Sequence, residues 1–303
     1  MTTQRYANID GLRAIAALGV MVEHMFGDLL RQTPPAAGPL NVAGDLLVQN
    51  VSLGRFGVAL FFLISGFVVP FSIGGERPLF QFAVSRVFRL YPALWLALAV
   101  LATMAWLGGE PPRAITVLAN MTMAPTLFGQ PWLSPIYWTL FIELVFYILI
   151  ALLFSAGALR RVAVLSLLSL ALVVAQVVAV PSVAAFSLAR GDNFIMEGLT
   201  PVLTAYALAF VIFMAAVRFD RPRSLLLSRI GLISYSMYLF HWPVNITVYR
   251  VLPLTGQIGD IATMLICSGL VLLVSWLVYR LVERPMIMFG RAIVLRHGVA
   301  SRP

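Results

Sequence analysis

The sequence predicts an all-α membrane protein, a polytopic bundle of transmembrane helices with no soluble domain. Of the 303 residues, 61% are hydrophobic and 11% are charged, which is outside the range of soluble globular domains. The hydrophobic residues gather in runs of about 20, the length that a helix needs to cross the hydrocarbon core. Basic residues stand in short clusters between these runs, so we interpret the net charge of +9 as loop charge and not as a nucleic-acid surface.

About eight spans are predicted from the apolar runs and from the charges, prolines and glycines that bound them. They cover roughly residues 10–30, 53–73, 90–108, 136–156, 162–180, 198–217, 230–249 and 260–282. The first run begins like a signal peptide, but charged residues interrupt it and no small-residue cleavage site follows, so we expect a retained span. Segment 114–128 is apolar but broken by Pro125, and we expect it to be re-entrant or part of an outer loop.

The basic residues, all 21 of which are Arg, predict the orientation of the bundle. If the N-terminus is cytoplasmic, sixteen of them lie on the cytoplasmic side and five lie outside. Because cytoplasmic loops carry an excess of basic residues, both termini are predicted to be cytoplasmic. We expect one transmembrane domain over residues 1–290 and a short basic cytoplasmic tail over residues 291–303.

Four titratable side chains fall inside predicted spans: Glu23, His24, Glu143 and His241. Such groups are costly in hydrocarbon, so they usually face a polar cavity and serve a function. Arg13 and His24 are eleven residues apart, which places them on one face of a helix and about 16 Å apart along it. An anionic group held by Arg13 could therefore point a long ligand toward His24. A snorkelling Arg and a histidine that bonds a neighbouring helix remain the alternative.

Glu143 lies about 10 Å into its predicted helix. A carboxylate at that depth needs a partner, such as an imidazole or an Arg that lines the same cavity. His241 lies at a depth similar to that of His24, and Tyr238 is three residues before it on the same helical face. A role in helix packing alone remains open for His241.

Arg86 and Arg89 are three residues apart on one helical face just inside the membrane. Paired guanidinium groups suit phosphate, although a contact with lipid phosphates is an equally simple explanation. Ser65 belongs to a Ser-Gly pair that permits close helix approach; as a catalytic serine it is weak, because no G-x-S-x-G elbow surrounds it. Cys267 is the single cysteine, so neither an intrachain disulfide nor a cysteine-based zinc site is expected, and we predict no metal.

Six segments in order resemble the membrane acyltransferase-3 family, bacterial O-acyltransferases that modify exported or lipid-linked glycans and some small molecules. They are DGLRAIAALGVMVEH, FFLISGF, the Arg86 and Arg89 pair, WTLFIELVFY, GLISYSMYLFH and LVERP with Glu283. The family is usually described with ten spans; eight are counted here, and the deficit falls between residues 157 and 229. The soluble esterase-like domain that is fused to some members is not expected.

The resemblance implies a cytoplasmic acyl-CoA donor, acetyl-CoA by default, and a hydroxyl of a carbohydrate or glycolipid as acceptor. It makes His24 similar to the catalytic histidine, and Arg13, Arg86 and Arg89 similar to residues that hold the donor phosphates. Glu143 matches the intramembrane glutamate of the family. His241 and Glu283 match motif positions whose roles we leave unassigned.

We expect His24 to act as a general base, because a neutral imidazole with a pKa of about 6.5 can take the proton of an attacking sugar hydroxyl. Glu143 would orient the ring and stabilise the imidazolium. Glu23 is the weaker candidate for that role, because it points about 100° away from His24 on the helix. A covalent acyl-histidine route remains open.

Two other classes of function are kept as alternatives. One is a proton-coupled transporter with His24, Glu143 and His241 as a relay, and the other is a lipid-binding scaffold. The expected location is the bacterial cytoplasmic membrane, in contact with lipid. The acyl group, the acceptor, and any homo-oligomer or glycan-assembly partner remain open.

Overall fold

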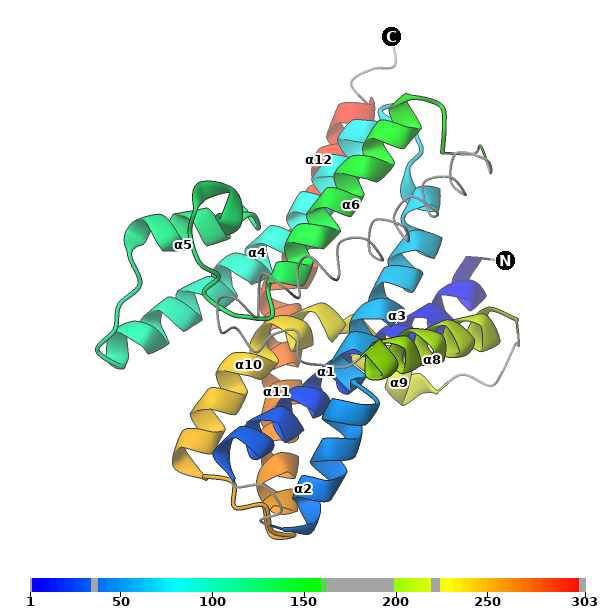
Figure 1. Ribbon diagram of the computed structural model, residues 1–303. Helices are drawn as coiled ribbons and strands as arrows, with labels where there is room; N and C mark the ends of the chain where they lie inside the picture. The colour runs from blue at the N-terminus through cyan, green and yellow to red at the C-terminus, as the bar shows by residue number, and fades with distance from the viewer. Residues whose placement is uncertain (1, 34–37, 160, 162–198, 219–223, 300–303) are drawn as a thin grey trace.

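The computed structural model of the protein describes residues 2–33, 38–159, 161, 199–218 and 224–299. Every regular element in these ranges is a helix, so the all-α prediction is confirmed (Figure 1). The α-helices are α1 (Thr2–Gln32), α2 (Pro39–Gly44), α3 (Leu53–Val68), α4 (Pro78–Leu107), α5 (Ala114–Met121), α6 (Trp138–Ser155), α8 (Leu199–Arg218), α9 (Leu225–Leu232), α10 (Ser234–Val251), α11 (Asp260–Val278) and α12 (Arg284–Val299). Two π-helical segments, η1 (Asp45–Asn50) and η5 (Tyr279–Glu283), and two 3₁₀ segments, η2 (Pro70–Ser72) and η3 (Pro125–Phe128), complete them.

Five stretches of the described chain are long and apolar enough to cross a membrane. They are Leu53–Ser72, Pro78–Leu107, Trp138–Ser155, Pro201–Arg218 and Asp260–Arg296. Helix α1 covers the predicted first span and is long enough, but its charged residues lower its hydropathy. The predicted span 162–180 lies outside the described residues.

One predicted span differs from the helices that form. The predicted span 230–249 is divided at Ile233 between α9 and α10. Gly231, just before the break, lies so close to the carbonyl of Asp10 that a Cβ would overlap it, so α9 packs directly on α1. Farther along the chain, α11 continues through η5 into α12.

Helix α1 occupies the middle of the bundle and packs against α3, α9 and α10 (Figure 1). Helix α3 packs in turn against α8, α10 against α11, and α12 against α4. The contact between α1 and α3 is close, because Gly57 of α3 lies against the carbonyl of Ala16 and the side chain of Val20. Small residues at a helix interface let two backbones approach in this way. Their proximity places polar groups of α1 beside those of α3.

The segment after α4 folds back along that helix. The hydroxyl of Tyr91 donates to the carbonyl of Thr122 at 3.5 Å, and the indole N–H of Trp95 donates to the carbonyl of Met121 at 3.2 Å. Because α4 continues from Tyr91 to Leu107, the chain returns about 24 Å along the helix. These contacts agree with both forms expected for segment 114–128, a re-entrant segment and part of an outer loop.

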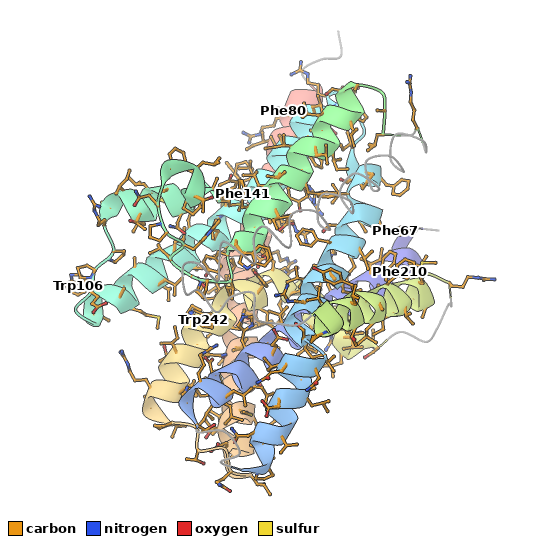
Figure 2. All side chains as sticks on the ribbon, in the orientation of Figure 1. Phe67, Phe80, Trp106, Phe141, Phe210 and Trp242 are labelled. Carbon is orange, nitrogen blue, oxygen red and sulfur yellow. The ribbon has the colours of Figure 1, made fainter. Side chains whose placement is uncertain are left out.

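Large apolar side chains cover the outside of the bundle. Figure 2 shows Trp106 and Phe210 directed away from the helices, and they are 65% and 54% exposed. Trp242, in contrast, comes from α10 and contacts the ring of His24 on α1. An exterior of this composition suits lipid and leaves the polar side chains to meet between the helices.

Candidate active site

A cavity of about 140 Å³ lies among α1, α3, α4, α6 and α10. Six residues singled out in the sequence are part of its lining: Arg13, Ser65, Arg86, Arg89, Glu143 and Tyr238. They come from five helices that are far apart in the sequence. The fold therefore brings together the predicted donor-site arginines and the intramembrane glutamate.

Three guanidinium groups give the cavity its charge. Arg13 forms an ion pair with Asp10 at 3.0 Å on its own helix. The guanidinium of Arg86 lies over the rings of Phe82 and Tyr147, at 5.2 and 5.3 Å from their centroids. Its Nη2 donates to Ser72 at 3.2 Å, while its buried Nε–H has no hydrogen-bond partner within the described part of the chain. Arg89 lines the same cavity one turn along α4 from Arg86.

Glu143 is the single carboxylate among the described residues that line the cavity. Its carboxylate accepts a hydrogen bond from Tyr147, one turn along α6. The sequence predicts Glu143 as the partner of His24, but in the structure its hydrogen bond is to Tyr147. Three cationic side chains and one anionic one favour the binding of an anion in this cavity.

The two ends of the cavity differ in chemistry. Arg86 and Tyr147 mark one end, and Thr139 and Tyr238 line the other, about 12 Å away along α6. The hydroxyl of Tyr238 donates to the carbonyl of Ile136, and the hydroxyl of Thr139 lies 2.5 Å from that of Tyr238. Hydroxyl groups thus line the end that is remote from Arg86.

His24 is not part of the lining of the cavity among the described residues, but ring contacts connect it to Tyr238 at the hydroxyl-lined end. The ring of Tyr238 is 6.0 Å from the ring of His241, and His241 is 5.0 Å from His24, centroid to centroid. Trp242 contacts the other side of His24 at 5.8 Å. Tyr238 and His241 therefore stand between the arginine-lined cavity and His24.

The tautomer of both histidines follows from their hydrogen bonds. Nδ1 of His24 is 2.8 Å from the carbonyl oxygen of Val20, and Nδ1 of His241 is 3.0 Å from that of Met237. Because a carbonyl oxygen only accepts, each neutral ring carries its proton on Nδ1 and its lone pair on Nε2. The carbonyl of Val20 holds the ring of His24, the role that the sequence predicts for Glu143.

The remaining predicted residues join helices. Glu23 accepts a hydrogen bond from the backbone N–H of Gly54 at 2.5 Å, at the start of α3. Glu283, at the end of η5, is buried and accepts a hydrogen bond from Ser236 of α10. Neither carboxylate is among the described residues that line the cavity. Glu23 thus joins α1 to α3, and Glu283 joins η5 to α10.

Two tyrosines of the lining were not predicted as site residues. Tyr147 carries the hydrogen bond to Glu143, and Tyr235 lines the cavity while its hydroxyl donates to the carbonyl of Leu90 at 2.9 Å. The signal for Tyr147 was its spacing of one turn from Glu143, which an aromatic belt at the membrane interface explains as simply.

Comparison with known proteins identifies the family. The model of the family described as "Acyltransferase domain" matches residues 6–195 and 177–280. The exopolysaccharide production protein ExoZ of Rhizobium meliloti (strain 1021) is 28% identical over 314 residues, which cover 86% of this chain and 98% of ExoZ. Nodulation protein 10 of Rhizobium leguminosarum bv. viciae is 30% identical over 167 residues, 48% of this chain and 43% of that protein. No solved structure matches. With its family model matched over most of its length, the chain belongs to the membrane acyltransferase-3 family and is an O-acyltransferase.

Proposed function

We propose that this enzyme transfers an acetyl group from cytoplasmic acetyl-CoA to a hydroxyl of an exopolysaccharide or of its lipid-linked precursor, at the bacterial cytoplasmic membrane. The name of ExoZ refers to exopolysaccharide production, and the similarity extends over nearly all of that protein, which supports this class of acceptor. The observation that carries the proposal is the cavity lined by three arginines.

The arginines suit the phosphates of the donor. The described lining contains one carboxylate beside Arg13, Arg86 and Arg89, so it has an excess of positive charge before a ligand binds. Guanidinium groups bind phosphate through paired, charge-assisted hydrogen bonds. The buried Nε–H of Arg86 has no partner in the described ranges, and a phosphate oxygen of coenzyme A would accept from it.

The rest of the cavity suits the thioester arm. The lining of the cavity also includes the apolar residues Val58, Phe61, Phe62 and Leu140. An apolar wall accommodates a pantetheine chain and excludes water, which limits wasteful hydrolysis of the thioester. The acyl end then reaches His24 past Tyr238.

His24 acts as the general base in this proposal. Its Nε2 takes the proton of the acceptor hydroxyl as the oxygen attacks the thioester carbonyl. The carbon–sulfur bond breaks, the coenzyme A thiolate leaves, and the proton passes from His24 to that thiolate. The carbonyl of Val20 keeps Nδ1 protonated and the ring in place, as an acid does in other acyl transferases.

The test uses the purified full-length protein in lipid nanodiscs with acetyl-CoA. The acceptor probe is a set of oligosaccharides from the exopolysaccharide of Rhizobium meliloti (strain 1021), freed of esters by mild alkali. We expect thiol release that depends on the acceptor, and acceptor molecules heavier by one acetyl group in mass spectra. His24→Ala should lower kcat about 10²- to 10⁴-fold, the range for a positioned base.

His297, the third histidine of the chain, provides the matched control, because His297→Ala should retain the activity of the unaltered protein. Acetylation that persists in His24→Ala would remove the base from the proposal. Proton-driven solute uptake without consumption of acetyl-CoA would favour the transporter alternative instead.

A further inference from the structure

Two imidazoles of the same tautomer lie side by side at the interface of α1 and α10. The centroids of His24 and His241 are 5.0 Å apart, and the ring planes are inclined by 60°. In each ring the Nδ1–H donates to the carbonyl four residues earlier, so the two free nitrogens are both Nε2. The proposed mechanism employs only the Nε2 of His24.

The Nε2 of His241 lacks a partner. The residue is 1% exposed, and this atom has no hydrogen-bond donor within the part of the chain that the structure describes. Buried polar atoms in native proteins are generally paired, and an unpaired one costs stability. We therefore expect the Nε2 of His241 to accept a hydrogen bond at another stage of the reaction, when a donor is present.

His24 becomes such a donor when it takes the proton of the acceptor hydroxyl. The carboxylate of Asp28, one turn along α1, could also accept a hydrogen bond from a charged His24, but it already has two partners. It forms an ion pair with Arg31 and accepts a hydrogen bond from Asn245 at 3.4 Å. The guanidinium of Arg31 lies 5.7 Å from the ring centroid of Trp242, which contacts His24, and a cation does not stabilise a charged imidazole. The unpaired Nε2 of His241 is the acceptor that remains.

We infer that His241 is a positioning residue that shares the proton held by His24 during acyl transfer. The inference rests on the proposed function. The hydroxyl proton moves to Nε2 of His24 as the carbon–oxygen bond forms, and the resulting Nε2–H is shared with Nε2 of His241. When the carbon–sulfur bond breaks, the thiolate takes the proton, and both imidazoles return to their neutral forms.

The separation of the rings is compatible with this sharing. A ring nitrogen lies about 1.1 Å from its centroid, and a hydrogen bond spans about 2.9 Å, so an aligned pair has centroids about 5 Å apart. At the observed centroid distance of 5.0 Å, the two rings need only rotate toward each other to form this hydrogen bond. The helices that carry them can keep their separation.

Two substitutions of similar size separate proton sharing from packing. His241→Gln keeps a hydrogen-bond acceptor near the position of Nε2, and His241→Leu removes it. In the nanodisc assay with acetyl-CoA and the de-esterified oligosaccharides, we expect His241→Leu to lower kcat about 10- to 100-fold, part of the contribution of a positioned base. KM for acetyl-CoA should change by less than about twofold, and His241→Gln should recover most of the lost kcat.

Each variant is compared at equal amounts of folded, monodisperse protein, and His241→Met provides the apolar substitution if His241→Leu does not fold. In the His24→Ala background, His241→Leu should cause no further loss, because the two residues act as a unit. Unchanged kcat in His241→Leu, or equal losses in the Leu and Gln variants, would overturn the inference. A fully active His24→Ala would overturn both proposals, whereas an inactive His24→Ala beside a fully active His241→Leu would overturn only this one.

Discussion

The guanidinium of Arg86 lies against two aromatic rings and one hydroxyl. It lies over Phe82 and Tyr147, and Nη2 donates to Ser72. Such contacts hold a planar group in a fixed direction, and they leave the Nε–H available for a ligand. Lysine has neither the plane nor the forked donors, so its charge alone would not reproduce the site.

We therefore predict that Arg86→Lys raises KM for acetyl-CoA about tenfold, the equivalent of one lost charge-assisted hydrogen bond. Initial rates at several concentrations of acetyl-CoA measure the change. Arg113→Lys is the matched control, because Arg113 is exposed before α5 and is not among the described residues lining the cavity. Equal KM values for the two variants would contradict a donor site at Arg86.

The hydrogen bond between Tyr147 and Glu143 gives a second prediction for single residues. Tyr147→Phe keeps the ring beneath Arg86 and removes only the hydroxyl that pairs with the carboxylate. We expect a loss of about 1–3 kcal/mol in the free energy of unfolding, the usual cost of a buried polar group without a partner. Chemical unfolding in mixed micelles measures it. Glu143→Gln in the same background should reduce the loss, and an additive result would argue against the pairing.

Spacing along single helices predicted several residues that line the cavity, but not the hydrogen-bond partners of these residues. Arg13, Arg86, Arg89 and Glu143 do line one cavity. The partner predicted for Glu143 lies on another helix, whereas Tyr147 is one turn away on the same helix and competes successfully. Which of the two is within reach depends on how α6 is rotated against α1, and a periodic pattern carries no information about that rotation.

At the level of the helices, boundaries depend on tertiary contacts that hydropathy does not encode. Both α9 and α10 are apolar around Ile233, so the sequence predicts one span where the chain forms two helices. The close approach of Gly231 to the carbonyl of Asp10 fixes α9 on α1. Helix α4 likewise begins at Pro78, well before the predicted residue 90, so Arg86 and Arg89 lie within the helix.

The contact between α1 and α3 can be tested with one methyl group. At Gly57 an added Cβ meets the carbonyl of Ala16 and the side chain of Val20, whereas at Gly66 nothing lies within 4 Å. We predict that Gly57→Ala lowers the free energy of unfolding by about 1–3 kcal/mol, as overpacking does, while Gly66→Ala leaves it nearly unchanged. Thermal unfolding of both variants in the same detergent gives the comparison.

Because Arg13 and Ser65 lie on these two helices, Gly57→Ala should also weaken the binding of acetyl-CoA. Similar unfolding curves for the two variants would show that the helices do not need this proximity.

In the described part of the chain, large apolar side chains cover the exterior, and several titratable side chains lie between the helices. Helix α1 illustrates this arrangement, because it carries Arg13, Glu23 and His24 while packing against α2, α3, α8, α9 and α10. Its low hydropathy reflects its position in the middle of the bundle and its contribution to the site. The outward-facing side chains, in contrast, are those that made the membrane class predictable from composition alone.

The orientation of the bundle in the membrane gives the last prediction. Sixteen of the 21 arginines fall on the side assigned to the cytoplasm, and the pair Arg86 and Arg89 lies toward that end of α4. Acetyl-CoA should therefore reach the cavity from the cytoplasmic face only. Sealed inside-out vesicles supplied with external acetyl-CoA should release thiol, whereas right-side-out vesicles should do so only after permeabilisation with detergent. Vesicles that contain Arg86→Lys control for background hydrolysis and should respond weakly in both orientations at low acetyl-CoA. Acetyl-CoA carries several phosphate charges and does not cross a lipid bilayer unaided. Equal thiol release from sealed vesicles of both orientations would therefore place the entrance for acetyl-CoA elsewhere.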